Sequence, residues 1–338
     1  MALKQVIGQE RALKILRRCI AKNRIAHAYL FAGEDGIGKK LTAVNFAKTL
    51  NCRNNADDSL FTAGEKEKSA VEADSCDNCS SCVKIDKRSH PDVFFIAPEN
   101  GQIKVNAIRR LEESLSYKAF EGNWKIAVID GAETLNQSAA NAFLKTLEEP
   151  PGRSVLVLIS SMPELVPLTV RSRCQRINFS PLPLKKMGEL LEHGLSTERT
   201  PMDSGRAELL GLLSGGRPGW ALSGDLIGTR DRLFDDFKSL LSSVNEDLWE
   251  DREAMEEWFE WVQLWLRDIA VFAATGSADL TINKDRAKEI KDMSQRVQLK
   301  DVLKLSNTFY NIKDTLRFNL NKQLTLYHTY LLLKKTFA

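Results

Sequence analysis

The stretch AHAYLFAGEDGIGKK, residues 26–40, decides the fold. Its first half is an apolar run that ends on a glycine, which is typical of a short buried strand leading into a loop. A helical pattern follows at 39–50. Between them, three glycines and a lysine fit the phosphate-loop pattern Gly-x4-Gly-Lys: Gly33, Gly36, Gly38 and Lys39. The succession of strand, glycine loop and helix predicts the start of a parallel α/β unit.

Alternation of strands and helices continues on both sides of this loop. We expect helices at 9–22, about 105–116 and 136–148, and strands at 92–97, 125–130, 154–160 and 175–179. This rhythm predicts a parallel sheet covered by helices on both faces. Beyond Pro181 the pattern is helical only, at about 184–193, 205–213, 219–227 and then in longer helices.

The change of pattern divides the chain into an α/β domain over 1–180, a small helical domain over 181–224 and a helical C-terminal domain over 225–338. Several domains are expected at 338 residues, because single hydrophobic cores stop growing beyond about 250–300 residues. Residues 54–74 are polar, lack apolar periodicity and predict an exposed insertion.

Composition narrows the functional classes. The formal charge of +3 is small for this length, so a basic surface would have to be local, and a free-standing nucleic-acid-binding protein is disfavoured. The chain has no run of eighteen apolar residues, and its start has no apolar stretch of the kind found in signal peptides. A cytoplasmic protein without a membrane partner is expected.

The phosphate loop departs from the complete motif at one position. Backbone amides of the glycine loop and the charge of Lys39 could cradle phosphate oxygens at a helix N-terminus. Lys40 stands where the motif has serine or threonine, whose hydroxyl would hold Mg²⁺. Hydrolysis should therefore suffer, whereas ATP binding at this degenerate loop stays open. The competing interpretation is a glycine turn that merely joins strand to helix.

A second departure lies at the end of the strand KIAVID, residues 125–130. Asp130 could hold Mg²⁺ through water, but the next residue is Gly131, which cannot act as a general base. Glu133 is two positions further on and should face elsewhere. Asp130 taken alone could equally cap a turn at the end of its strand.

Four cysteines indicate a metal site: Cys52, Cys76, Cys79 and Cys82. The unit Cys-x2-Cys-x2-Cys with one earlier cysteine supplies four thiolates, enough for a closed, structural tetrahedral zinc site in a module at about 52–90. Iron–sulfur ligation uses the same residue type. His90 is not needed as a ligand, and Cys19 and Cys174 lie outside the cluster.

Several segments resemble the AAA+ clamp-loader family of bacterial DNA polymerases. In the order of that family they are VIGQERA (6–12), the phosphate loop, the cysteine cluster, HPDVFFIAPE (90–99), VIDGAETLNQSAANAFLKTLEEPP (128–151), LVPLTVRSRCQRINFSPL (165–182), GGRPGWAL (215–222) and FNLNKQLTLYHTYLLL (318–333). The resemblance implies an AAA+ domain with a zinc module, a small helical lid and a C-terminal collar that holds subunits together.

Within this family, the ATP-hydrolysing gamma/tau type keeps serine or threonine after the lysine and an acidic residue after the aspartate. Lys40 and Gly131 therefore favour a non-hydrolysing scaffold subunit. Such a subunit would join gamma/tau and delta subunits in a pentamer and meet the sliding clamp and primer-template DNA through that complex. The alternative is an active gamma/tau-type ATPase.

The same resemblance assigns roles to two arginines. Ser172-Arg173-Cys174 matches the motif whose arginine enters a neighbouring subunit's ATP site, a task suited to a planar, always charged guanidinium. Arg171 is the competing residue, and a surface salt bridge is the plain alternative for either. Arg217 in GGRPGWAL matches the second sensor, which contacts the γ-phosphate, or it pairs with a carboxylate.

Two further patterns favour structure over chemistry. Glu148 and Glu149 are adjacent in a helix and so point about 100° apart, which favours structural or inter-subunit contacts over a catalytic pair. Four tryptophans share helical spacing and predict a helix–helix interface, as expected in a collar, rather than a nucleobase platform: Trp249, Trp258, Trp261 and Trp265.

Overall fold

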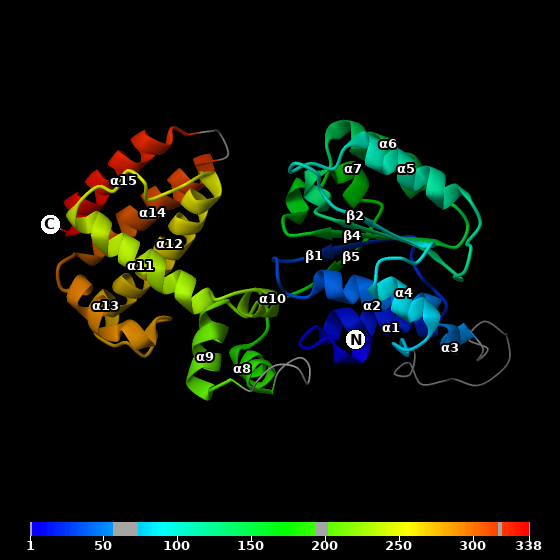
Figure 1. Ribbon diagram of the computed structural model, residues 1–338, viewed down its shortest axis with the longest axis horizontal. Coiled ribbons are helices and arrows are strands. Elements are labelled where there is room, and N and C mark those ends of the chain that lie inside the picture. The colour runs from blue at the N-terminus through cyan, green and yellow to red at the C-terminus, as the bar shows by residue number, and fades with distance from the viewer. Residues whose placement is uncertain (1, 57–73, 194–201, 317–319, 338) are drawn as a thin grey trace. The chain divides into compact units, whose positions relative to one another are not determined.

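A computed structural model describes residues 2–56, 74–193, 202–316 and 320–337 (Figure 1). The chain forms two compact units, which are treated separately. Unit 1 comprises Met1–Leu190 and Gly215–Gly219, and unit 2 comprises Leu191–Ser214 and Trp220–Ala338. The division into three domains stays a prediction. The exposed insertion expected at 54–74 falls mostly on residues outside the described ranges.

Unit 1 is built around a five-stranded parallel sheet in the order β2-β3-β4-β1-β5. Its strands are β1 (Ala28–Ala32), β2 (Val93–Ile96), β3 (Lys125–Asp130), β4 (Ser154–Ser160) and β5 (Gln175–Asn178). Its helices are α1 (Glu10–Ala21), α2 (Lys39–Asn51), α3 (Arg53–Ala56), α4 (Ser80–Asp86), α5 (Val105–Ser116), α6 (Gln137–Glu148), α7 (Leu168–Arg171) and the start of α8 (Leu184–His193).

Strand periodicity explains the two apolar layers of unit 1. Successive side chains of a strand point to opposite faces, so Tyr29 and Phe31 pack with α1 and α2, whereas Leu30 packs with α5 and α6. Figure 1 shows these helix pairs on opposite sides of the sheet. The predicted fold class is confirmed as a parallel α/β sheet domain followed by a helical C-terminal part.

Sheet topology places the candidate site at one edge of the sheet. β4 lies between β1 and β3, and Ile159 of β4 is in register with both Phe31 and Asp130. Because all three strands are parallel, the loop that leaves β1 and the carboxylate at the end of β3 lie at the same edge. The phosphate loop and Asp130 are therefore brought together, as the sequence predicts.

The described residues of unit 2 form helices joined by loops, with no strand among them. After the end of α8 it contains α9 (Ser204–Leu213), α10 (Pro218–Leu222, which begins in unit 1), α11 (Leu226–Ser242), α12 (Arg252–Thr275), α13 (Ala287–Ser294), α14 (Leu299–Thr315) and α15 (Lys322–Phe337). The single helix expected at 219–227 is wrong. The helix α10 ends at Leu222. A new helix then begins at Leu226, where the Asp225 carboxylate accepts a hydrogen bond from the Gly228 N–H at 3.1 Å.

The four tryptophans lie in the core of unit 2. Each is buried, and the indole rings of Trp249 and Trp258 meet edge to face with centroids 5.3 Å apart. α12, which carries three of them, packs against α11, α13 and α14. The predicted helix–helix interface is thus internal to the unit, and these buried rings are not available to a neighbouring subunit. In the part of the chain that the structure describes, no helix is long and apolar enough to cross a membrane.

Candidate nucleotide and metal sites

The phosphate loop closes on its own lysine. Gly38 adopts a left-handed backbone with φ of 98° and leads directly into α2, which places Lys39 in the first helical turn. The Lys39 ammonium donates to the carbonyls of Gly33 and Glu34, the latter at 2.6 Å, and lies 3.5 Å from an Asp35 carboxylate oxygen. Burial lowers the pKa of Lys39, although the Asp35 carboxylate opposes that shift. The charge meant for phosphate is held by loop carbonyls.

Lys40 forms an ion pair with Asp130, the carboxylate expected to hold the metal. Its ammonium lies 2.7 Å from the Asp130 carboxylate, which ends β3, and both side chains are partly exposed. The two charges attract directly, so a divalent cation would have to displace an ammonium to reach Asp130. The residues at this position do not fit Mg²⁺, because one of the two expected ligands is absent and the other is in an ion pair.

Glu133 does not replace the missing general base. Its carboxylate accepts hydrogen bonds from the backbone N–H of Ser161 at 3.1 Å and from the Ser161 hydroxyl at 2.8 Å. Burial raises the pKa of Glu133, but the hydrogen bonds that it accepts outweigh burial and leave that pKa lowered. Gly131, where the base would stand, has φ of 72°, in the left-handed region.

The segment 215–219 packs against the phosphate loop, and its role as a sensor stays a prediction. The Gly219 N–H donates to the Gly36 carbonyl at 2.8 Å, and a Cβ at position 219 would lie 2.9 Å from the Gly36 Cα. Only glycine allows so close an approach. Arg217 reaches the same loop, with its Nε 3.9 Å from the Glu34 carboxylate.

Arg173 and its neighbours lie elsewhere on unit 1. The Arg173 guanidinium donates to Glu148 at 2.5 Å and to the Thr169 carbonyl at 2.9 Å, and the Ser172 hydroxyl donates to the same carbonyl at 3.2 Å. The competing Arg171 is bound to Glu164. Arg173 is thus partly exposed and paired with a carboxylate of its own chain, which is the structural use expected of Glu148.

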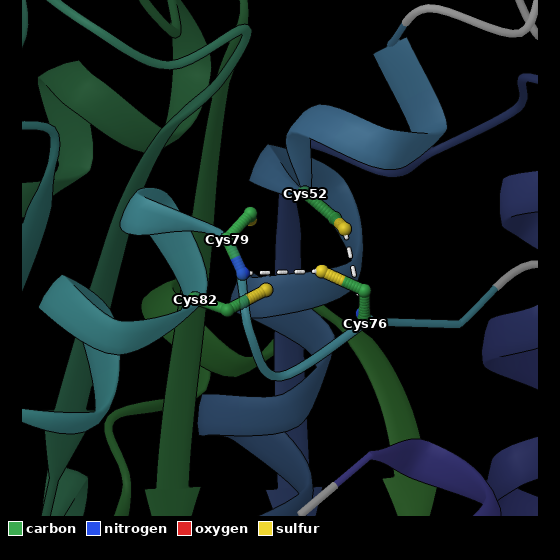
Figure 2. A group of neighbouring side chains, drawn as sticks. All are labelled: Cys52, Cys76, Cys79 and Cys82. Carbon is green, nitrogen blue, oxygen red and sulfur yellow. Dashed lines mark hydrogen bonds between the residues drawn. The ribbon is translucent and has the colours of Figure 1, made fainter.

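The four predicted cysteines come together (Figure 2). Their sulfur atoms all lie within 4.8 Å of one another, and none forms a disulfide. The Cys76 N–H donates to the Cys52 sulfur at 3.4 Å, and the Cys79 N–H donates to the Cys76 sulfur at 3.3 Å. Four thiols converging on one point, with backbone donors that stabilise thiolate charge, fit a closed tetrahedral metal site.

Helix ends build this cluster. Cys52 follows the last residue of α2, whereas Cys79 and Cys82 lie at the start of α4. Burial opposes ionisation of Cys79, but hydrogen bonds from the backbone of Cys82 and Arg53 and from neighbouring thiols lower its pKa to about 6. His90 is not among the converging groups: its Nδ1 accepts from the Asp92 N–H and its Nε2 lies 3.0 Å from the Ser81 hydroxyl.

One anchoring residue could not be recognised from the sequence. Lys48 of α2 is fully buried, and its ammonium lies 2.5 Å from Asp77 and 2.9 Å from Asp86. Burial lowers the pKa of Lys48, but the two carboxylates outweigh it and raise that pKa overall. The lysine joins the cysteine loop to α2. No local pattern indicates this contact, because Lys48 and Asp86 are 38 residues apart.

The sheet and its glycine loop indicate the class of protein. A glycine loop that joins a strand to a helix, with an aspartate at the same edge of the parallel sheet, is typical of an α/β protein of the phosphate-loop class. Residues 8–183 match the family described as DNA polymerase III, delta subunit, and residues 235–335 match DNA polymerase III, delta subunit, C terminal. The chain belongs to the DNA polymerase III delta subunit family, within the clamp-loader group that includes delta′, tau and gamma.

Curated relatives agree with this family. The delta′ subunit of DNA polymerase III from Bacillus subtilis is 34% identical over 189 residues, which cover 56% of this chain and 53% of that protein. The delta′ subunit from Pseudomonas aeruginosa is 36% identical over 196 residues, covering 57% and 54%. The tau subunit from Bacillus subtilis is 30% identical over 239 residues, covering 68% and 39%. The matched part spans about half the length of these relatives, or less.

Proposed function

We propose that this chain is a delta′-type scaffold subunit of a DNA polymerase III clamp loader and does not hydrolyse ATP itself. The ion pair between Lys40 and Asp130, at 2.7 Å, is the observation that carries this proposal. Phosphoryl transfer in phosphate-loop proteins relies on a metal ion bridging the phosphates. An ammonium at the metal position, with a glycine at the position of the base, supports loss of hydrolysis.

The proposed partners follow from the family. The chain would assemble with tau/gamma and delta subunits in the cytoplasm, and would act on the sliding clamp and on primer-template DNA through that assembly during replication. Two surfaces support inter-subunit contacts. Met162, Leu165 and Leu168 are apolar and exposed close to Arg173 in sequence, and exposed apolar side chains also line one face of α15.

We propose that Arg173 acts outside its own chain, in the ATP site of a neighbouring subunit. Its side chain is 36% exposed, and its guanidinium offers a planar, charged fork for phosphate oxygens. In the free chain its partner is Glu148. The geometry supports a simple exchange, in which Arg173 leaves this carboxylate for the neighbour's γ-phosphate when the complex assembles. Ser172 would help to orient the motif through Thr169.

Zinc is the metal ion that we propose for the four-cysteine cluster. When bound, it would hold the ends of α2 and α4 together, a structural task that leaves no open coordination position. The converging sulfurs and the buried Lys48 support a role in fixing this loop rather than in catalysis.

The test of this function uses the isolated chain and the reconstituted complex. The isolated chain should show no steady ATP hydrolysis. In the complex, Arg173→Ala should greatly lower clamp- and DNA-stimulated ATPase, since arginines acting in trans contribute up to about 10³–10⁵ in rate in GTPases. The loss would be smaller for the whole complex, because only one of its ATP sites is affected. Arg173→Lys should fail nearly as badly.

Arg176 provides a matched control, because it is an exposed arginine of the same region that pairs with Glu164 at 3.3 Å. Arg176→Ala should leave the stimulated ATPase near its original rate. Normal clamp loading by the Arg173→Ala complex at equal subunit content would remove the proposed role. Hydrolysis by the isolated chain that Lys39→Ala abolishes would identify a gamma/tau-type ATPase instead.

A further inference from the structure

Helix α1 carries a row of cations on its exposed face. Arg11, Lys14, Arg18 and Lys22 are all exposed, and their spacing of three and four residues places them within about 80° of arc at 100° per residue. None of the four forms an ion pair with a carboxylate in the part of the chain that the structure describes. Like charges at this spacing repel one another, so the row does not stabilise the helix that carries it.

A groove beside this row adds to the positive charge. It has a volume of about 670 Å³ and lies along α1 and the start of the chain. Five cations line it, Lys4, Lys14, Arg17, Arg18 and Lys186, against two carboxylates, Glu10 and Glu189. Glu10 is already bound to Lys186. The Nε of Arg17 is buried and has no hydrogen-bond partner among the described residues.

This concentration of charge is local. The whole chain has a formal charge of only +3, so the cations beside α1 are balanced by acidic residues elsewhere. A dense row of lysine and arginine without carboxylate partners is the usual electrostatic signature of a surface that binds a polyanion. We call Lys4, Arg11, Lys14, Arg17, Arg18 and Lys22 the α1 basic face.

We propose that the α1 basic face binds the sugar-phosphate backbone of duplex DNA without reading its sequence. The chain belongs to a DNA polymerase family, which makes DNA the polyanion at hand. Arg11 lies in the first turn of α1 and Lys22 directly follows its last residue, so the row extends over about 16 Å at 1.5 Å per residue. Duplex DNA presents phosphates of both strands over this distance.

Duplex is favoured over single-stranded DNA by the residues that line the groove. Single strands are bound by aromatic side chains on which bases stack, combined with positive charge. The described residues that line the groove include no tryptophan, tyrosine or phenylalanine. A phosphate-only contact suits the outside of a duplex, whose bases are already stacked on one another. This contact is separate from the proposed action of Arg173, and either can fail without the other.

The experiment measures binding of the full chain to a fluorescent duplex of about 30 base pairs by anisotropy, across about 50–200 mM salt. The triple variant Arg11→Ala, Lys14→Ala, Arg18→Ala should bind at least about tenfold more weakly at the lowest salt. It should also lower the slope of log affinity against log salt by about 2.7, since each phosphate contact contributes about 0.9. Arg11→Lys with Arg18→Lys should keep both quantities, because the contact is one of charge.

A control of equal charge lies in unit 2. Lys288, Lys300 and Lys304 are exposed and have no carboxylate partner among the described residues, so their triple alanine variant should bind DNA as the unchanged chain does. Circular dichroism and thermal unfolding measure whether each variant is folded. If the α1 triple variant is unfolded, Arg18→Ala alone tests the proposal, with an expected slope change of about 0.9.

Four results with DNA would overturn the proposal. They are no binding of duplex by the unchanged chain at the lowest salt, equal losses in the control triple, an unchanged salt slope in the α1 triple, and single-stranded DNA bound as tightly as duplex. Vesicles that contain phosphatidylserine are the remaining comparison. Binding to them through the α1 basic face, with weaker binding to duplex, would assign the surface to a membrane and likewise overturn the proposal.

Discussion

At the scale of single residues, two positions define the nucleotide site. Lys40 stands where a metal-binding hydroxyl is expected. Its ammonium pairs with the Asp130 carboxylate and so competes with a metal ion for that group. Gly131 goes further, since its φ of 72° is costly for any other residue. The backbone after β3 has therefore adjusted to glycine, and restoring the motif residue by residue would not restore its geometry.

We predict that Gly131→Glu destabilises the chain by about 1–2 kcal/mol, the cost of a left-handed backbone for a residue with a Cβ. Gly131→Ala is the control and should cost about the same, because both residues carry a Cβ on a left-handed backbone and the nearest atom to a Cβ here is 3.5 Å away. Chemical denaturation measures both. Combined with Lys40→Thr, the Glu variant should still lack ATPase; steady turnover by this double variant would contradict the argument.

At the scale of elements, α2 connects the two candidate sites. It begins at the phosphate loop with Lys39 and ends beside Cys52, and the buried Lys48 ties it to Asp77 and Asp86. Removing one partner of a buried charge leaves the other unpaired, which is costly. The cysteine loop is thus held to α2 by an ion-pair network as well as by the thiol ligands.

We predict one zinc per chain, bound by the four cysteines. Cys79→Ser should lower the metal content and increase proteolysis and hydrogen exchange across residues 74–90, because metal binding is coupled to folding of such loops. Elemental analysis of chain purified without chelator measures the content. Cys19→Ser, outside the cluster, should retain the metal. Metal-free protein under reducing conditions would rule out the site, and iron with a visible absorption band would assign it to a cluster instead.

At the scale of the whole molecule, the sequence best predicts those helices and strands whose burial follows from a local apolar pattern. The strand 154–160 and the helix 105–116 agree with β4 and α5, because a continuous apolar run or a clear helical period specifies each. The helix predicted at 219–227 is wrong because Asp225 can cap a new helix as well as continue an old one.

The same distinction applies to the residues of the candidate sites. The cysteines and the phosphate loop are recognisable as short motifs, and the structure brings each set together. Lys48 with its two aspartates and Arg173 with Glu148 could not be predicted, because these partners meet only through the packing of separate elements. The row on α1 is visible in the sequence, but only the structure reveals that it is exposed and lacks carboxylate partners among the described residues.

One face of α15 is apolar and open to water. Leu324, Tyr327 and Leu331 are spaced by three and four residues, so they share this face, and they are 71%, 44% and 62% exposed. Fully burying a leucine is worth about 1.5–3 kcal/mol, so the face would gain considerably from a partner. In a subunit that assembles with others, such a face is a candidate contact between subunits.

The last prediction concerns assembly through this face. Leu324→Glu with Leu331→Glu should prevent entry into a complex with tau/gamma and delta, while thermal unfolding of the isolated chain changes little because both side chains are already in water. Leu280→Glu is the control, since Leu280 is 63% exposed in the same unit and should tolerate the charge without loss of assembly. Native mass spectrometry of the mixed subunits measures incorporation, and full assembly of the double variant would mean that α15 is not the contact.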